Sequence, residues 1–175
     1  MEDLQQTEWF DLRERTWQHL RHKNHISRSK YVPLLQFLTI PSFSDTWCID
    51  VVESDGITSA FLTTWNSTKD VRAFETGLER LKHPRPFVPS LQSTLLPVNS
   101  ESIEGILKRF EDIAMPLKPA RNSSIYLDGT SYELQFGEGH RGIRLSWHED
   151  MPMDWPIELR ELSREFLAIE NSFVW

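Results

Sequence analysis

An α+β fold is the class that this sequence predicts: an antiparallel sheet of about five or six strands built from hairpins, with helices packed on one face. Three observations lead to it. Asp55-Gly56 and Asp128-Gly129 mark two tight hairpin turns, because both central positions of such turns require positive φ. Apolar and polar residues alternate on either side of these turns, which is the pattern of half-buried strands. Other segments carry apolar residues at helical spacing.

The N-terminal region is expected to form a helix over residues 7–22. Its apolar stripe consists of Trp9, Leu12, Thr16 and Leu20, widened by Phe10 and Trp17. Residues 23–46 show a less regular pattern, in which Pro33 and Pro41 bracket a short apolar run from Leu34 to Ile40.

The clearest hairpin covers residues 47–65. Its turn pairs Trp47 with Thr64, Ile49 with Leu62, and Val51 with Ala60, and this set forms one apolar face. The other face holds Cys48, Asp50, Phe61 and Thr63 and is mixed. A mixed face indicates partial cover by another element, for which the N-terminal helix is the candidate.

Helical spacing recurs over residues 68–82 and again after Asn99 or Ser100, either of which can cap a helix. The stripe of this later helix consists of Ile103, Ile106, Leu107, Phe110 and Ile113. Between the two helices, a proline-rich segment at 84–97 predicts an extended connector and is a possible weak boundary. We expect a single domain over 1–175, because neither side of the connector offers a sufficient core.

The C-terminal region is expected to add strands at 125–127, 130–136 and 143–147, followed by a helix with Asp154 as its cap. The predicted buried stripe of this helix is Trp155, Leu159, Leu162, Phe166, Ile169 and Phe173. The inner face of the strands carries Ile125, Leu127, Tyr132, Leu134, Phe136, Ile143, Leu145 and Trp147. The outer face carries Glu133, Gln135, Arg144, Ser146 and His148.

Composition limits the classes of function. The chain has 175 residues, of which 39% are hydrophobic and 26% charged, as in ordinary globular proteins. The net charge of -7 disfavours binding to nucleic acid or to an anionic membrane. No apolar run approaches the ~18 residues of a membrane span, and the acidic start differs from a signal peptide. A single cysteine, Cys48, excludes an intrachain disulfide, and we expect a cytoplasmic location.

Metal and cofactor sites are not expected from the sequence. His19, His22 and His25 have a suggestive spacing, but on one helix the first and third lie ~120° apart, so the three cannot converge on one tetrahedral ion, although a pair such as His19 and His22 could bind metal weakly. The glycines at 137, 139 and 142 join two antiparallel strands and open no helix that could hold a phosphate.

Catalytic residues are likewise not predicted; if an enzyme site exists, it is expected around His148 to Asp154, with His148, Glu149 and Asp150 as the candidates. A histidine beside carboxylates can perform acid/base chemistry, but these acids also suit the positive end of the following helix. Cys48 could act as a nucleophile only if the fold brought a histidine close to it.

The motifs Asp128-Gly-Thr130, Tyr132-Glu-Leu134, Arg144-Leu-Ser-Trp147 and Pro152-x-x-Trp155 resemble a C-terminal signature of small uncharacterised bacterial proteins. The resemblance covers residues 125–165 and implies no activity, although some such acidic proteins are immunity partners of toxins. We therefore expect a non-catalytic binding or interaction protein with a protein partner. Its binding surface is expected at the exposed outer face, on Glu133, Gln135, Arg144 and His148.

Overall fold

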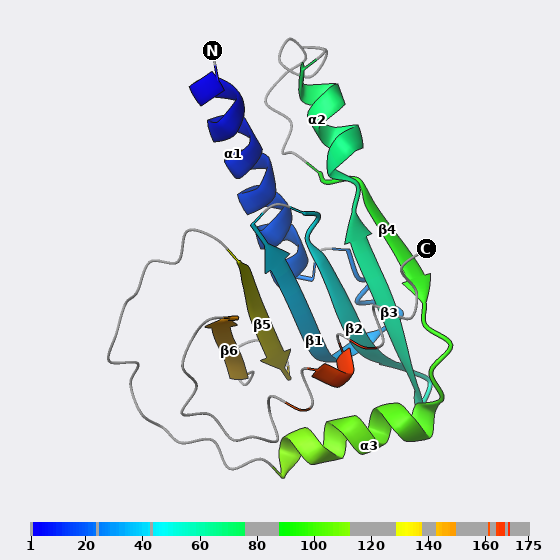
Figure 1. Ribbon diagram of the computed structural model, residues 1–175. Coiled ribbons are helices and arrows are strands. Elements are labelled where there is room, and N and C mark those ends of the chain that lie inside the picture. The colour runs from blue at the N-terminus through cyan, green and yellow to red at the C-terminus, as the bar shows by residue number, and fades with distance from the viewer. Residues whose placement is uncertain are drawn as a thin grey trace.

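The computed structural model describes residues 2–23, 25–42, 44–75, 88–112, 129–137, 143–149, 161, 164–166 and 168. The elements in chain order are α1 (Glu2–Arg21), β1 (Val32–Pro41), β2 (Trp47–Ser54), β3 (Ile57–Trp65), α2 (Ser67–Glu75), β4 (Leu91–Leu95), α3 (Ser100–Glu111), β5 (Thr130–Phe136) and β6 (Ile143–His148). The six strands form one antiparallel sheet in the order β4-β3-β2-β1-β5-β6, with α1 and α3 toward opposite ends of it (Figure 1). The α+β class and its antiparallel sheet are confirmed.

The β2–β3 hairpin has the predicted register. Trp47 pairs with Thr64, Ile49 with Leu62, and Val51 with Ala60. Asp55 and Gly56 at the turn have φ values of 52° and 75°, the positive values that a two-residue hairpin turn requires.

The strand β1 lies at the middle of the sheet, in a region where the sequence indicated only an irregular apolar run. Its residues from Leu35 to Ile40 are all buried, because β2 and β5 flank it and both faces of the sheet are covered here. The prolines do not interrupt the strand: Pro33 stands at a register shift and Pro41 is the last residue. Proline is tolerated at such positions because little backbone hydrogen bonding is lost there.

The predicted connector at 84–97 contains a strand, β4, which pairs with β3 and forms one edge of the sheet. The helix expected over 68–82 is described as α2 as far as Glu75, and its second half lies outside the described residues. Asn99 caps α3 as predicted, since its side chain accepts a hydrogen bond of 2.7 Å from the backbone N–H of Ser102.

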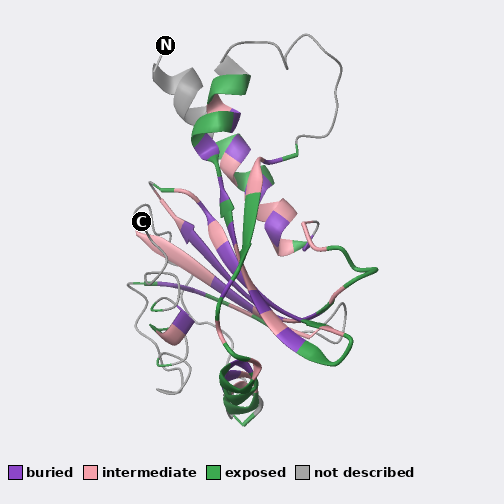
Figure 2. Ribbon diagram, turned by 90° about the vertical axis from the view of Figure 1, so that its right-hand side faces the viewer, coloured by how far each residue is buried: buried purple, intermediate pink, exposed green. Residues whose placement is uncertain are grey.

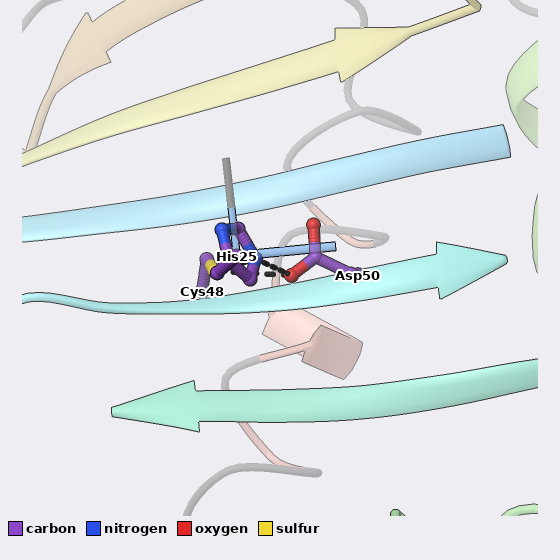
Figure 3. Close-up of side chains that lie close together, drawn as sticks. All are labelled: His25, Cys48 and Asp50. Atoms are coloured by element: carbon purple, nitrogen blue, oxygen red, sulfur yellow. Dashed lines mark hydrogen bonds and ion pairs between the residues drawn. The ribbon is translucent and has the colours of Figure 1, made fainter. Parts of the chain in front are cut away.

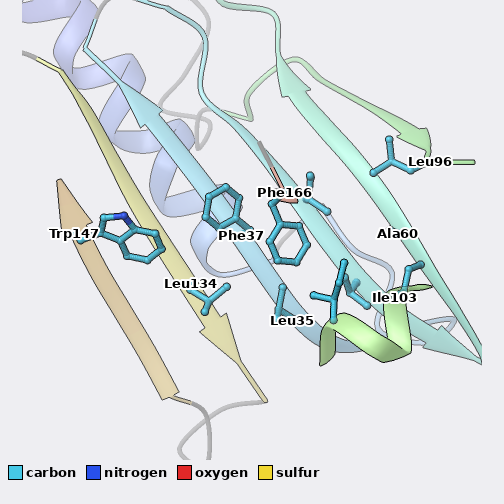
Figure 4. Close-up of a cluster of buried hydrophobic side chains, with 11 residues drawn as sticks. Leu35, Phe37, Ala60, Leu96, Ile103, Leu134, Trp147 and Phe166 are labelled. Atoms are coloured by element: carbon cyan, nitrogen blue, oxygen red, sulfur yellow. The ribbon is translucent and has the colours of Figure 1, made fainter. Parts of the chain in front are cut away.

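One face of the sheet carries the main hydrophobic core, centred on Phe37 (Figure 4). The Phe37 ring is fully buried and lies 5.3 Å from the Phe166 ring and 5.9 Å from the Tyr132 ring, centroid to centroid. Ile103 and Ile106 of α3 close this core from one end. Burial is concentrated in the middle of the sheet (Figure 2).

The opposite face of the sheet is covered by the C-terminal half of α1, as the mixed face of the 47–65 hairpin indicated. Leu20 packs there against Leu38, Ile40 and Cys48. Phe10, expected to widen the buried stripe of this helix, is 51% exposed, because the contacts of α1 with the sheet come from its other end. Ile143 was also expected to be buried, but it is exposed because it begins the edge strand β6.

Several sequence predictions fall outside the described residues: the strand at 125–127, the residue Asp128 of the second turn, the cap Asp154 and most of the last stripe. Of that stripe, Phe166 is described, helical and buried, as predicted. None of the helices in the described part of the chain has both the length and the apolar character needed to cross a membrane.

Candidate functional site

The face covered by α1 contains an open cleft of about 680 Å³ between this helix and the strands β5 and β6. Its lining from α1 consists of Phe10, Arg13, Glu14, Trp17 and Arg21. Its lining from the sheet consists of Ile40, Ser131, Tyr132, Glu133, Ser146, Trp147 and His148. Volumes of this size are typical of ligand sites in proteins.

The floor of the cleft is built around the Glu133 carboxylate. Arg21 binds both of its oxygens, through Nε at 2.9 Å and through a terminal nitrogen at 2.5 Å. The indole N–H of Trp17 and the hydroxyl of Ser146 donate to the same carboxylate at 3.3 and 3.1 Å. The Arg21 guanidinium also lies over the Trp17 ring, 3.7 Å from its centroid. Glu133 is therefore a neutralised anchor that holds α1 to β5.

The predicted binding surface lies on this face, but it is not uniformly exposed. Arg144 is exposed and Gln135 is half-buried, whereas Glu133 and His148 are buried, contrary to the expectation. The reason is that α1 covers the polar side of β5, so Glu133 meets Arg21 instead of water. Glu133 and His148 line the cleft, and Gln135 and Arg144 pair with each other in the next row of the sheet.

The three catalytic candidates are only partly described. His148 is buried, Glu149 is exposed, and Asp150 lies outside the described residues. Both described side chains lie against Gly129, where an added Cβ would come within 2.5 Å of Glu149 Oε1 and 2.7 Å of the His148 ring. Gly129 also has φ of +98°, so glycine is required here on two grounds.

A second polar cluster, not predicted from the sequence, is buried on the same face of the sheet (Figure 3). Cys48 and Asp50 stand two residues apart on β2 and therefore point to the same side. His25 reaches them from the segment between α1 and β1. Its Nε2 lies 2.6 Å from Asp50 Oδ2 and 3.7 Å from Cys48 Sγ, and Sγ donates to the same Oδ2 at 3.2 Å.

Gln36 fixes the position of the Asp50 carboxylate. Its side-chain amide donates to Asp50 Oδ1 at 2.7 Å and to the backbone carbonyl of Leu20 at 3.1 Å. Gln36 therefore connects β1, β2 and the end of α1 through one buried side chain. The sequence contained a signal for this arrangement, because Gln36 is a polar residue inside the apolar run 34–40. A buried side-chain amide at such a position needs hydrogen-bond partners.

The fold thus brings a histidine close to Cys48, as a nucleophilic role of this cysteine would require. The environment nevertheless opposes that role. The pKa of the Cys48 thiol is raised well above its ordinary value of 9.0, first by burial and then by the Asp50 carboxylate. The thiol has no exposed surface, so a substrate would have no access to it.

No protein-family model, no curated protein and no solved structure matches this chain.

Proposed function

We propose that this protein is a non-catalytic binding protein, and that a segment of a partner protein occupies the cleft between α1 and β5–β6. The observation that supports this most directly is the combination of an open cleft with an exposed aromatic ring, Phe10, at its edge. Aromatic side chains are enriched in protein interfaces, where they act as anchors.

The charges at the floor of the cleft favour binding over catalysis. An acid or base must have a free site for the proton that it transfers, yet hydrogen bonds from Arg21, Trp17 and Ser146 fill the acceptor sites of Glu133. The wall of the cleft also presents the ring of Trp17, which suits contact with an apolar or aromatic side chain.

In its narrower form, the proposal is that of an immunity-type protein whose partner is a basic toxin. The net charge of -7 supports it, because opposite net charges accelerate association. If the partner is basic, the rate of association should decrease steeply as salt is added.

The alternative is an enzyme that uses His148 with Glu149 or Asp150, and the position of His148 in the wall of the cleft favours it. The variant His148→Gln separates the two proposals. An enzyme should lose turnover when this ring loses its acid/base capacity, whereas a binding protein should still bind its partner, with a changed affinity because His148 lines the cleft.

Site-specific photo-cross-linking tests the binding proposal. A photoreactive phenylalanine analogue is placed at Phe10 and, in a matched control, at the exposed Leu95 of β4, on the opposite edge of the sheet. Each protein is then irradiated in a lysate of the source cells. We expect one specific adduct from position 10 and none from position 95, with competition by the unlabelled wild type but not by Phe10→Asp.

Equal adducts from both positions would place the partner elsewhere than in the cleft. The absence of any competed adduct from position 10 would overturn the proposal of a protein partner.

A further inference from the structure

The cluster of His25, Cys48 and Asp50 combines the three side-chain types that bind zinc in proteins. Imidazole nitrogen, thiolate sulfur and carboxylate oxygen are all common zinc ligands, and one of each is present. The three ligand atoms lie within 4.8 Å of one another. This convergence comes from the tertiary fold, since His25 precedes β1 and the other two residues follow it on β2.

The separations between the ligand atoms are close to those around a tetrahedral zinc ion. Zinc bonds of about 2.0–2.3 Å place neighbouring ligand atoms about 3.3–3.6 Å apart. Here Sγ lies 3.7 Å from the histidine nitrogen and 3.2 Å from the carboxylate oxygen. The remaining separation, 2.6 Å between His25 Nε2 and Asp50 Oδ2, is a hydrogen bond. It must open by roughly 0.7 Å to admit the ion, and the His25 ring, which is not on a strand, is the group that can move.

The side chains around the cluster are buried, and they hold its ligand atoms in position before any ion binds. The side chains of His25 and Asp50 are 5% and 2% exposed, and Cys48 is fully buried. Gln36 holds the oxygen of Asp50 that faces away from the cluster, so the second oxygen, Oδ2, is directed at the other two ligands. Outer contacts that orient a ligand in this way are typical of metal sites.

The His25 ring makes its polar contacts through one of its two nitrogens. Its other ring nitrogen, Nδ1, is buried and has no hydrogen-bond partner among the described residues. All the polar contacts of the ring are therefore made by Nε2, the atom that faces Cys48 and Asp50.

We propose that His25, Cys48 and Asp50 form a binding site for a single zinc ion, with water as the fourth ligand. Thiolate and imidazole together favour zinc over magnesium or calcium, which prefer oxygen ligands. The thiolate and the carboxylate supply two negative charges to the ion, and the buried Lys23, whose charge acts on Cys48, adds a positive charge nearby. The bound ion would fasten the segment between α1 and β1 to β2, and this role is independent of the occupant of the cleft.

Cobalt spectroscopy provides a direct test, because Cys48 is the only cysteine of the chain. The full-length protein is freed of metal with a chelator and titrated with Co²⁺. We expect a thiolate-to-cobalt charge-transfer band in the near ultraviolet and intense visible bands of tetrahedral cobalt, both saturating at one equivalent. One equivalent of Zn²⁺ should abolish them. If saturating Co²⁺ produces no charge-transfer band, the proposal is wrong.

Variants then assign the ligands. In a calorimetric zinc titration, Cys48→Ala and His25→Gln should each lose at least about 100-fold in affinity. His22→Gln, a matched change at an exposed histidine three residues from His25, should bind zinc as the wild type does. Equal zinc affinity in Cys48→Ala and the wild type would overturn the proposal. If Cys48→Ala does not fold, as judged by circular dichroism, the cobalt spectrum of the wild type still decides.

Discussion

We expect the variant Arg21→Met to lose a large part of the stability of the protein, because it leaves the Glu133 carboxylate buried and facing no cation. The Glu133 side chain is 7% exposed, and Arg21 binds both of its oxygens. Removing one partner of a buried ion pair costs about 3–5 kcal/mol. Glu133 keeps its hydrogen bonds from Trp17 and Ser146, so the lower end, about 3 kcal/mol, is expected.

The measurement is urea denaturation followed by far-ultraviolet circular dichroism, since the Trp17 ring contacts Arg21 and its fluorescence would change locally. A loss of about 3 kcal/mol corresponds to a melting temperature lower by roughly 6–12 °C for a chain of this size. The double variant Arg21→Met with Glu133→Gln should recover most of this loss, because the buried charge is then removed as well.

The chain offers a matched control in the exposed pair of Arg109 and Glu165. This pair also has two hydrogen bonds, at 2.7 and 2.6 Å and from the two terminal nitrogens of Arg109, but its side chains are 53% and 40% exposed. Arg109→Met should therefore cost only about 0–1 kcal/mol. Equal losses in Arg21→Met and Arg109→Met would refute the argument that burial determines the strength of the first pair.

Three further predictions follow from the core, a helix and the buried thiol. Phe37→Ala should cost about 3–5 kcal/mol in urea denaturation, since it empties the centre of the main core, and a loss below 1 kcal/mol would contradict that position. Gly105→Ala, in α3 with open space around the added Cβ, should raise the free energy of unfolding by roughly 0.5–1 kcal/mol, whereas Gly56→Ala, at φ of +75°, should lower it. The pKa of the Cys48 thiol is raised in the folded state above its ordinary value of 9.0. The buried thiol therefore stabilises the protein fully below pH 9.0, and this stabilisation is lost as the pH rises above that value. Denaturation between pH 8 and pH 10 should show this loss in the metal-free wild type and a smaller one in Cys48→Ala.

The parts of the fold that were predictable are those with local signals. The 47–65 hairpin combines an Asp-Gly turn with alternation on both sides, and a shift of one residue would expose its apolar face. The strand β1 has no alternation, because both of its faces are buried, and its flanking prolines suggested an interruption. A fully buried central strand produces a continuous apolar run, which periodicity alone cannot assign.

The candidate site was less predictable for a different reason. The polar face of β5 was identified correctly, but its exposure depended on whether α1 crosses it, which is a long-range property. The same holds for His25 and Cys48: the sequence gives the residue types, and only the packing of the segment after α1 on β2 brings them together.

The position of β1 also affects how the chain folds. Its partner on one side, β2, follows directly, but on the other side Leu35 pairs with Phe136, which comes 101 residues later in the sequence. Contacts between such distant residues slow folding, because a long loop must close before the pairing is gained. During synthesis, β2, β3 and β4 can assemble on β1 while its second edge waits for β5 to leave the ribosome. That unpaired central edge is where a nascent chain of this protein would be most susceptible to pairing with another chain.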